Sequence, residues 1–277
     1  MKTKDAVIIS EKNLFYLKTN NPKKKGVIIY VHGFCSTYYM HHEFVLMNDF
    51  KDYDYFSMNF SGHKIDSDKQ ELLSEYDVNK YANELIEQIL KYDFKNIILI
   101  GHSMGGGISL LVYMKLASRI KKIILVNAVN PAIYKSSIGL KYLFSVIRNE
   151  PLQIKELETE TKFTSNDELR YTIDEYLNYE LERFLVKKRK YMFLGVKLIS
   201  PVFYTKLNYI YKTITIPVLF LSGENDKVIP SKATKKYLAT LHNPHIEFQT
   251  ISNAKHIPFV EAFNEYNEKV WAFINKD

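Results

Sequence analysis

The sequence predicts an α/β protein with a mostly parallel central sheet, helices on both faces and an inserted helical segment. In residues 1–130 and 213–277, short apolar runs rich in β-branched residues alternate with stretches of helical periodicity. This alternation is typical of the strand–helix–strand units that build parallel sheets. Residues 131–212 break the rhythm, because they hold charged helical stretches and no clear strand. We therefore expect a core formed by residues 1–130 and 213–277, and a helical cap formed by residues 131–212.

Each element of this pattern is expected from its own residues. The first strands are expected at Asp5–Lys18 and Val27–Val31, joined by a turn at Thr19–Pro22. Further strands are expected at Tyr55–Phe60, Ile97–Ile100, Lys121–Asn127, Pro217–Ser222 and His245–Ile251. Helices are expected at Asp77–Tyr92, over the apolar stripe Ile108–Leu116, at Ser231–Leu241 and at Phe259–Ile274, with Asp77 as the N-cap of the first.

A G-x-S-x-G motif lies between the strand at Ile97–Ile100 and the helix that follows it. The motif consists of Gly101, His102, Ser103, Met104 and Gly105. Small residues on both sides allow a strained serine at the apex of a sharp turn, where the strand and the helix approach closely. The turn would present the serine hydroxyl at the positive end of the helix. We therefore expect Ser103 to be a nucleophile, with the flanking His102 as a packing or supporting residue.

A serine nucleophile requires a base and an acid that orients the base. In chains with this strand–turn–helix motif, the acid follows the serine in the sequence and the histidine follows the acid. Asp226 follows the strand at Pro217–Ser222, where ligand-facing groups gather in open α/β sheets. It is equally well placed to form a turn or to cap the helix that begins near Ser231. His256 follows the next strand, which makes it the strongest candidate for the base. His242 and His245 fall at a helix end and a strand start, and are weaker candidates.

The same chemistry requires N–H donors for the oxyanion that develops on the substrate. One is expected to be the backbone N–H of Met104, at the start of the helix after Ser103. The other is expected from Phe34, in the loop that follows the strand at residues 26–31. Gly33 is expected to permit an unusual backbone geometry there. His32 is expected to support this loop.

Taken together, these motifs resemble the α/β-hydrolase superfamily, in its group of capped serine esterases and lipases, including monoacylglycerol-lipase-like proteins. The matching segments occur in family order over almost the whole chain: 32–34, 61–63, 101–106, 223–226 and 254–256. The resemblance implies the α/β-hydrolase fold, with Ser103 as nucleophile, His256 as base and Asp226 as orienting acid. It further implies that Phe34 and Met104 supply the oxyanion hole, and that neither a cofactor nor a metal is used.

Composition restricts the partners and the compartment. The chain carries a formal net charge of +7, but its Lys and Arg are spread along the sequence apart from Lys187–Lys190. No nucleic-acid-binding motif accompanies them, so we expect no nucleic-acid partner and at most peripheral contact with anionic membranes. A single cysteine, Cys35, excludes an intrachain disulfide. The chain shows no signal-peptide pattern and no apolar run long enough to cross a membrane, which predicts a cytoplasmic protein.

The expected reaction is hydrolysis of a small-molecule carboxylic ester through an acyl-enzyme. Aromatic residues of the cap, which would line an acyl pocket or pack the cap on the core, favour an apolar acyl group of medium length or a monoacylglycerol. They are Tyr134, Tyr142, Phe144, Tyr176, Phe184, Tyr191, Phe193 and Phe203. A thioesterase and a C–C bond hydrolase with the same three residues are alternatives, as is a non-catalytic α/β-hydrolase scaffold.

Overall fold

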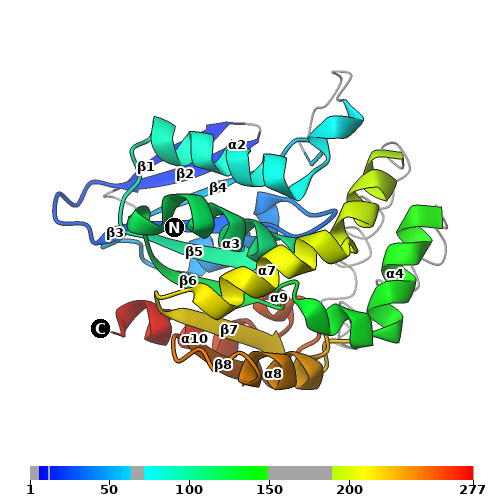
Figure 1. Cartoon of the computed structure of the whole chain (residues 1–277). Helices are drawn as coiled ribbons and strands as arrows, with labels where there is room; N and C mark the ends of the chain where they lie inside the picture. Colours follow the sequence, from blue (N-terminus) through cyan, green and yellow to red (C-terminus); the bar gives the residue numbers. More distant parts are fainter. Residues whose placement is uncertain (1–5, 12, 64–71, 149–188, 277) are drawn as a thin grey trace.

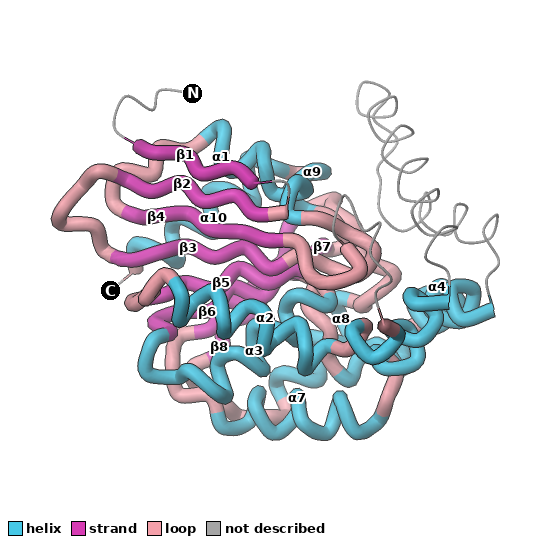
Figure 2. The backbone as a smooth tube through the Cα atoms, turned by 90° about the horizontal axis from the view of Figure 1, so that it is seen from above, coloured by secondary structure: helices cyan, strands magenta, loops and turns pink. Residues whose placement is uncertain are grey.

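The computed structural model describes residues 6–11, 13–63, 72–148 and 189–276. In these residues, strands form one eight-stranded sheet in the order β1-β2-β4-β3-β5-β6-β7-β8 (Figures 1 and 2). The strands are β1 (Ala6–Glu11), β2 (Leu14–Thr19), β3 (Gly26–Val31), β4 (Tyr53–Met58), β5 (Ile97–His102), β6 (Ile120–Val126), β7 (Val218–Gly223) and β8 (Ile246–Ile251). All neighbours from β4 to β8 pair in parallel, as the alternating pattern predicts.

The amino-terminal edge of the sheet differs from the expected pattern. Instead of one strand over Asp5–Lys18, the chain forms an antiparallel hairpin of β1 and β2, in which Glu11 pairs with Leu14. Polar residues at positions 11–13 interrupt the apolar run, and such a group favours a reversal of the chain. β2 then pairs antiparallel with β4, which begins two residues earlier than the expected strand. The parallel part of the sheet therefore starts at β4.

Helices cover both faces of the sheet, so its central strands are buried on both sides (Figures 1 and 2). The helices with described bounds are α1 (His42–Met47), α2 (Val78–Lys91), α3 (Met104–Leu116), α4 (Ser137–Arg148), α7 (Pro201–Thr213), α8 (Ser231–Ala239), α9 (Pro258–Glu261) and α10 (Phe263–Asn275). Alternate residues of β3 show the two layers. Ile29 belongs to the core cluster that includes residues of α2, α3 and α7, whereas Ile28 and Tyr30 belong to the cluster that includes residues of α1 and α10.

One expected helix has its expected N-cap, whereas another is interrupted. The helix after Asp77 begins at Val78, and the Asp77 side chain accepts a 2.8 Å hydrogen bond from the N–H of Asn79, as expected of an N-cap. The last helix is not continuous, because Ala262 (φ −141°, ψ 55°) lies outside the helical region and separates α9 from α10. This break leaves Glu261 at the end of a single turn, next to the loop that carries His256.

The described part of residues 131–212 is helical, in agreement with the expected pattern. It comprises a 3₁₀ turn (Pro131–Lys135), α4, a helical segment at 189–198 and α7. α7 packs on α3, where a Cβ at Gly107 would lie 2.9 Å from the ring of Phe203. Residues 149–188 lie outside the described residues. They include most of the charged sequence that is expected to be helical, and two residues of the basic run Lys187–Lys190. The division into core and cap therefore stays a prediction.

Candidate active site

Ser103 occupies the turn between β5 and α3 with backbone angles of φ 52° and ψ −117°. A positive φ is rare for a residue with a side chain and costs on the order of 1–3 kcal/mol, so the surrounding structure must hold it. The glycines of the motif are required by crowding. A Cβ at Gly105 would lie 2.0 Å from the carbonyl oxygen of Val31, and one at Gly101 would lie 2.6 Å from that of Gly105. The strand–turn–helix predicted from the sequence is therefore present.

Ser103, His256 and Asp226 are linked by two hydrogen bonds. His256 Nε2 lies 3.1 Å from Ser103 Oγ, and His256 Nδ1 lies 2.9 Å from Asp226 Oδ2. A carboxylate only accepts, so Nδ1 carries the proton, and in the neutral ring Nε2 is left to accept from the hydroxyl of Ser103. All three residues are at most 9% exposed. The geometry suits proton transfer from the serine to the imidazole.

Asp226 combines the two roles that its position in the sequence allowed. Its Oδ2 faces His256, while its Oδ1 accepts hydrogen bonds from the backbone N–H groups of Val228 (2.7 Å) and Ile229 (3.0 Å). These bonds fix the turn after β7, and they leave the second oxygen directed at the imidazole. The turn-forming function therefore positions the carboxylate rather than competing with the contact to His256.

Asn127, which sequence reasoning did not single out, joins the loops of Asp226 and His256. Its side chain accepts from the N–H of Gly223 (2.8 Å) and donates to the carbonyl of Lys255 (2.9 Å). The loops touch at Gly223, where a Cβ would lie 1.9 Å from the same Lys255 oxygen. His102 contributes a third contact, with its Nε2 2.9 Å from the carbonyl oxygen of His256. The signal for Asn127 was its place at the carboxyl end of β6, which lies between β5, the strand before Ser103, and β7, the strand before Asp226.

The loop after β3 passes beside Ser103, but Gly33 is not the residue with unusual backbone geometry there. The positive φ falls at Cys35 (51°). Gly33 is required by close approach instead, since a Cβ would lie 2.9 Å from His102 Nδ1 and 3.3 Å from the Cβ of Ser103. The expectation of a special backbone angle at Gly33 was therefore wrong. The sequence motif correctly indicated a glycine site but could not distinguish crowding from backbone geometry.

His32 ties this loop to the strand ends around it. The ring is fully buried, its Nδ1 lies 2.8 Å from the carbonyl of Gly33, and its Nε2 accepts a 3.3 Å hydrogen bond from the N–H of Phe60. Phe34 follows, and its ring meets the buried ring of Tyr191 edge-on at 5.8 Å. Met104 is the first, buried residue of α3. Met104 thus adjoins Ser103 in the chain, and Phe34 follows Gly33, which approaches Ser103 closely. The N–H groups of Phe34 and Met104 stay the predicted oxyanion donors.

The aromatic residues expected in the cap have different environments. Tyr191 is buried, and its hydroxyl donates to the carbonyl of Gly62 at 3.1 Å, so it joins the segment at 189–198 to the loop after β4, beside Phe34. Phe203 packs on α3, whereas Tyr134 and Phe144 are more than 40% exposed. Phe193 is partly buried. The remaining three are Tyr176 and Phe184, which lie outside the described residues, and Tyr142, whose side chain is not described.

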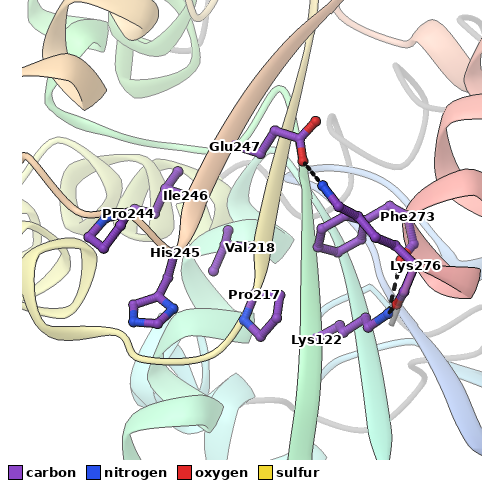
Figure 3. Close-up of a pocket in the computed structure, with 9 residues that line it drawn as sticks. All are labelled: Lys122, Pro217, Val218, Pro244, His245, Ile246, Glu247, Phe273 and Lys276. Carbon is purple, nitrogen blue, oxygen red and sulfur yellow. Dashed lines mark hydrogen bonds and ion pairs between the residues drawn. The ribbon is translucent and has the colours of Figure 1, made fainter.

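A surface pocket of about 480 Å³ lies at the amino ends of β7 and β8, opposite the strand ends that carry the candidate site (Figure 3). It is lined by the first residues of β7 and β8, Val218 and Ile246, and by His245, whereas Ser103 and His256 follow the carboxyl ends of their strands. Its lysines are engaged: Lys122 donates to backbone carbonyls at the end of α10, and Lys276 pairs with Glu247 at 3.0 Å. His245 is therefore far from the candidate site. His242, the other weaker candidate, is exposed in the connection between α8 and β8.

Among the residues that the structure describes, no group of three or more His, Cys, Asp or Glu side chains has an arrangement that could hold a metal ion. Within the same residues, no helix combines the length and apolar character that a membrane span requires.

Comparison with known proteins agrees with this architecture. The family model of the alpha/beta hydrolase fold matches residues 26–263. A Mycoplasma pneumoniae protein named "Putative esterase/lipase 1" is 29% identical over 263 residues, which cover 91% of this chain and 92% of the relative. Solved structures of similar fold include an esterase from Exiguobacterium antarcticum (TM-score 0.73, 15% identity, 95% of this chain and 96% of the other). Another is an esterase from a Rhodococcus species (TM-score 0.74, 18% identity, 100% and 99%). The chain therefore belongs to the α/β-hydrolase fold family.

Proposed function

We propose that this protein is a serine hydrolase that cleaves small-molecule carboxylic esters. The observation that carries the proposal is the hydrogen-bonded series from Ser103 through His256 to Asp226, with the serine on a strained turn at the start of α3. The relatives named as esterase/lipase support the same reaction class. A scaffold without activity would have no need to maintain the strained serine in line with a buried base and acid.

The proposed reaction proceeds through an acyl-enzyme. Ser103 Oγ attacks the ester carbonyl carbon while its proton passes to His256 Nε2, and Asp226 stabilises the imidazolium through the Nδ1–H bond. The N–H groups of Phe34 and Met104 stabilise the oxyanion. The intermediate collapses as the C–O bond to the alcohol breaks and His256 returns the proton to the departing oxygen. His256 then takes a proton from water as the water oxygen attacks the acyl carbon. The bond from the acyl carbon to Ser103 Oγ breaks, and His256 returns the proton to Oγ, which releases the acid and free Ser103.

We propose an apolar acyl group of medium length, or a monoacylglycerol, as the substrate type. The support is the contact between Phe34 and Tyr191, which places an aromatic side chain of the 131–212 segment beside the expected oxyanion loop. Aromatic walls bind acyl chains by burying apolar surface, worth about 0.8 kcal/mol for each methylene. Each added methylene should therefore raise kcat/KM about threefold to fourfold until the pocket is filled.

The test is hydrolysis of p-nitrophenyl esters from acetyl to palmitoyl by three purified proteins. They are the wild type, Ser103→Ala and Ser118→Ala, a matched control at an exposed serine after α3. We expect Ser118→Ala to match the wild type and Ser103→Ala to lose at least about 10³-fold in kcat. Retained activity in Ser103→Ala would refute the proposal. No turnover of any oxygen ester, with turnover of an acyl thioester or a C–C substrate, would instead support the corresponding alternative.

A further inference from the structure

Glu261 places a buried carboxyl group directly behind His256. It ends α9, and its Oε2 accepts a hydrogen bond from the backbone N–H of Lys255. This N–H group belongs to the residue that directly precedes His256. The other oxygen, Oε1, is buried and has no hydrogen-bond partner.

The environment of this carboxyl is unfavourable for an ionised group. Burial is the main cause that raises the pKa of Glu261 to about 8; the negative charge of Asp226 acts in the same direction, while the hydrogen bond from the Lys255 N–H acts against it. At neutral pH the group is therefore mostly the neutral acid. A buried carboxyl with one unpartnered oxygen costs stability that an apolar side chain would not. This cost indicates that the carboxyl has a task at this position.

We propose that Glu261 is a positioning residue, which holds the backbone around His256 so that the imidazole stays in line between Asp226 and Ser103. This inference rests on the proposed function, because it concerns the positioning of His256, the proposed base.

The arrangement of hydrogen bonds on the His256 segment supports this role. Asn127 holds the carbonyl of Lys255, and His102 lies at the carbonyl of His256. In the peptide unit that joins Ala254 to Lys255, the carbonyl accepts from the N–H of Asn225 (2.8 Å) and the N–H donates to Glu261. With both of its polar groups bound, this unit cannot rotate freely, and the next two units are each held at the carbonyl. Rotation would swing the imidazole away from Ser103, and a displacement of about 1 Å at a catalytic group can cost about 10²-fold in rate.

Three substitutions separate the possible causes of an effect. Glu261→Ala removes the acceptor of the Lys255 N–H. Glu261→Asp keeps the acid but is one methylene shorter, so its carboxyl is withdrawn from that N–H. Glu261→Gln keeps an oxygen acceptor and has nearly the shape of the neutral acid. Glu265→Ala is the matched control, because Glu265 also accepts from a backbone N–H of this loop, that of Ser252 at 3.0 Å, but away from His256.

The first readout is steady-state hydrolysis of the best p-nitrophenyl ester near neutral pH. We expect Glu261→Ala to lower kcat about 10-fold to 100-fold with KM changed less than about twofold, and Glu261→Asp to lower it less. Glu261→Gln and Glu265→Ala should both stay within about threefold of the wild-type kcat. A wild-type kcat in Glu261→Ala and Glu261→Asp would overturn the inference. So would an equal loss in Glu265→Ala or in Glu261→Gln.

The second readout does not require turnover. The Nδ1 proton of His256, hydrogen-bonded to Asp226, should give a low-field proton resonance in the wild type that is absent in His256→Gln. We expect it to be retained in Glu261→Gln and to be shifted or exchange-broadened in Glu261→Asp, whose thermal unfolding shows that it is folded. An unchanged resonance in folded Glu261→Asp would overturn the inference. If the wild type hydrolyses no ester, the proposed function fails, and this resonance still decides the role of Glu261.

Discussion

The carboxyl of Glu261 should make the stability of this protein fall as the pH rises. Its pKa is raised from 4.5 to about 8, chiefly by burial, so the folded state keeps a proton that the unfolded chain has already released between these two pH values. The stabilising contribution is therefore complete below about pH 4.5 and is lost as the pH rises through about 8. The shift corresponds to at most about 5 kcal/mol, since each pH unit contributes about 1.4 kcal/mol.

Glu261→Gln removes this titration without changing the shape of the side chain. The stability of the variant relative to the wild type should therefore increase between about pH 5 and about pH 9. At about 2 °C per kcal/mol for a chain of this size, the difference in Tm should grow by up to about 10 °C. The assay is thermal unfolding followed by circular dichroism in buffers of equal ionic strength. Glu268→Gln, at an exposed position of α10, controls for the removal of a carboxylate in general. A difference in Tm between wild type and Glu261→Gln that is the same at both pH values would refute the reasoning.

Three other variants test the packing around the candidate site. Asn127→Ala deprives Gly223 N–H and the Lys255 carbonyl of their partner, and should destabilise the fold by about 1–3 kcal/mol in urea unfolding while lowering kcat. An unchanged kcat would show that Asn127 does not contribute to the geometry of the candidate site. Gly105→Ala places a Cβ 2.0 Å from a backbone oxygen and should prevent recovery of folded protein, so a normal yield of active protein would contradict the steric argument. Leu207→Ala empties a fully buried position where α7 packs against α3, and should cost about 2–5 kcal/mol by the same unfolding assay; a loss below about 1 kcal/mol would show that this contact is loose.

The sequence predicted the parts of the site that local rules govern. A serine between glycines, after a strand and before a helix, is a local pattern, because the crowding that requires the glycines comes from adjoining elements. The positions of Asp226 and His256 after successive strands were also readable, since the carboxyl ends of parallel strands meet at one edge of the sheet. The structure brings these three residues into hydrogen-bond contact.

The residues that support the site could not be predicted, because their partners are distant in the sequence. Asn127 joins two loops about a hundred residues further along the chain, and nothing in its neighbours specifies that contact. The interruption at Ala262 has neither glycine nor proline to mark it, although it leaves Glu261 beside His256. The hairpin of β1 and β2 was missed for a similar reason: its strands were read as one, and only their pairing distinguishes them. Such features depend on tertiary approach rather than on local preference.

The central claim, that Ser103 is a nucleophile activated by His256, is tested most directly by covalent capture. A fluorophosphonate should react with the Ser103 hydroxyl, forming a P–O bond as fluoride leaves and the proton passes to His256. Intact-protein and peptide mass spectrometry should then find one phosphonyl group, on the peptide that contains Ser103. The same treatment should leave Ser103→Ala unlabelled and label His256→Gln at least about 10²-fold more slowly. Absence of label in the folded wild type, or label on a residue other than Ser103, would contradict the account.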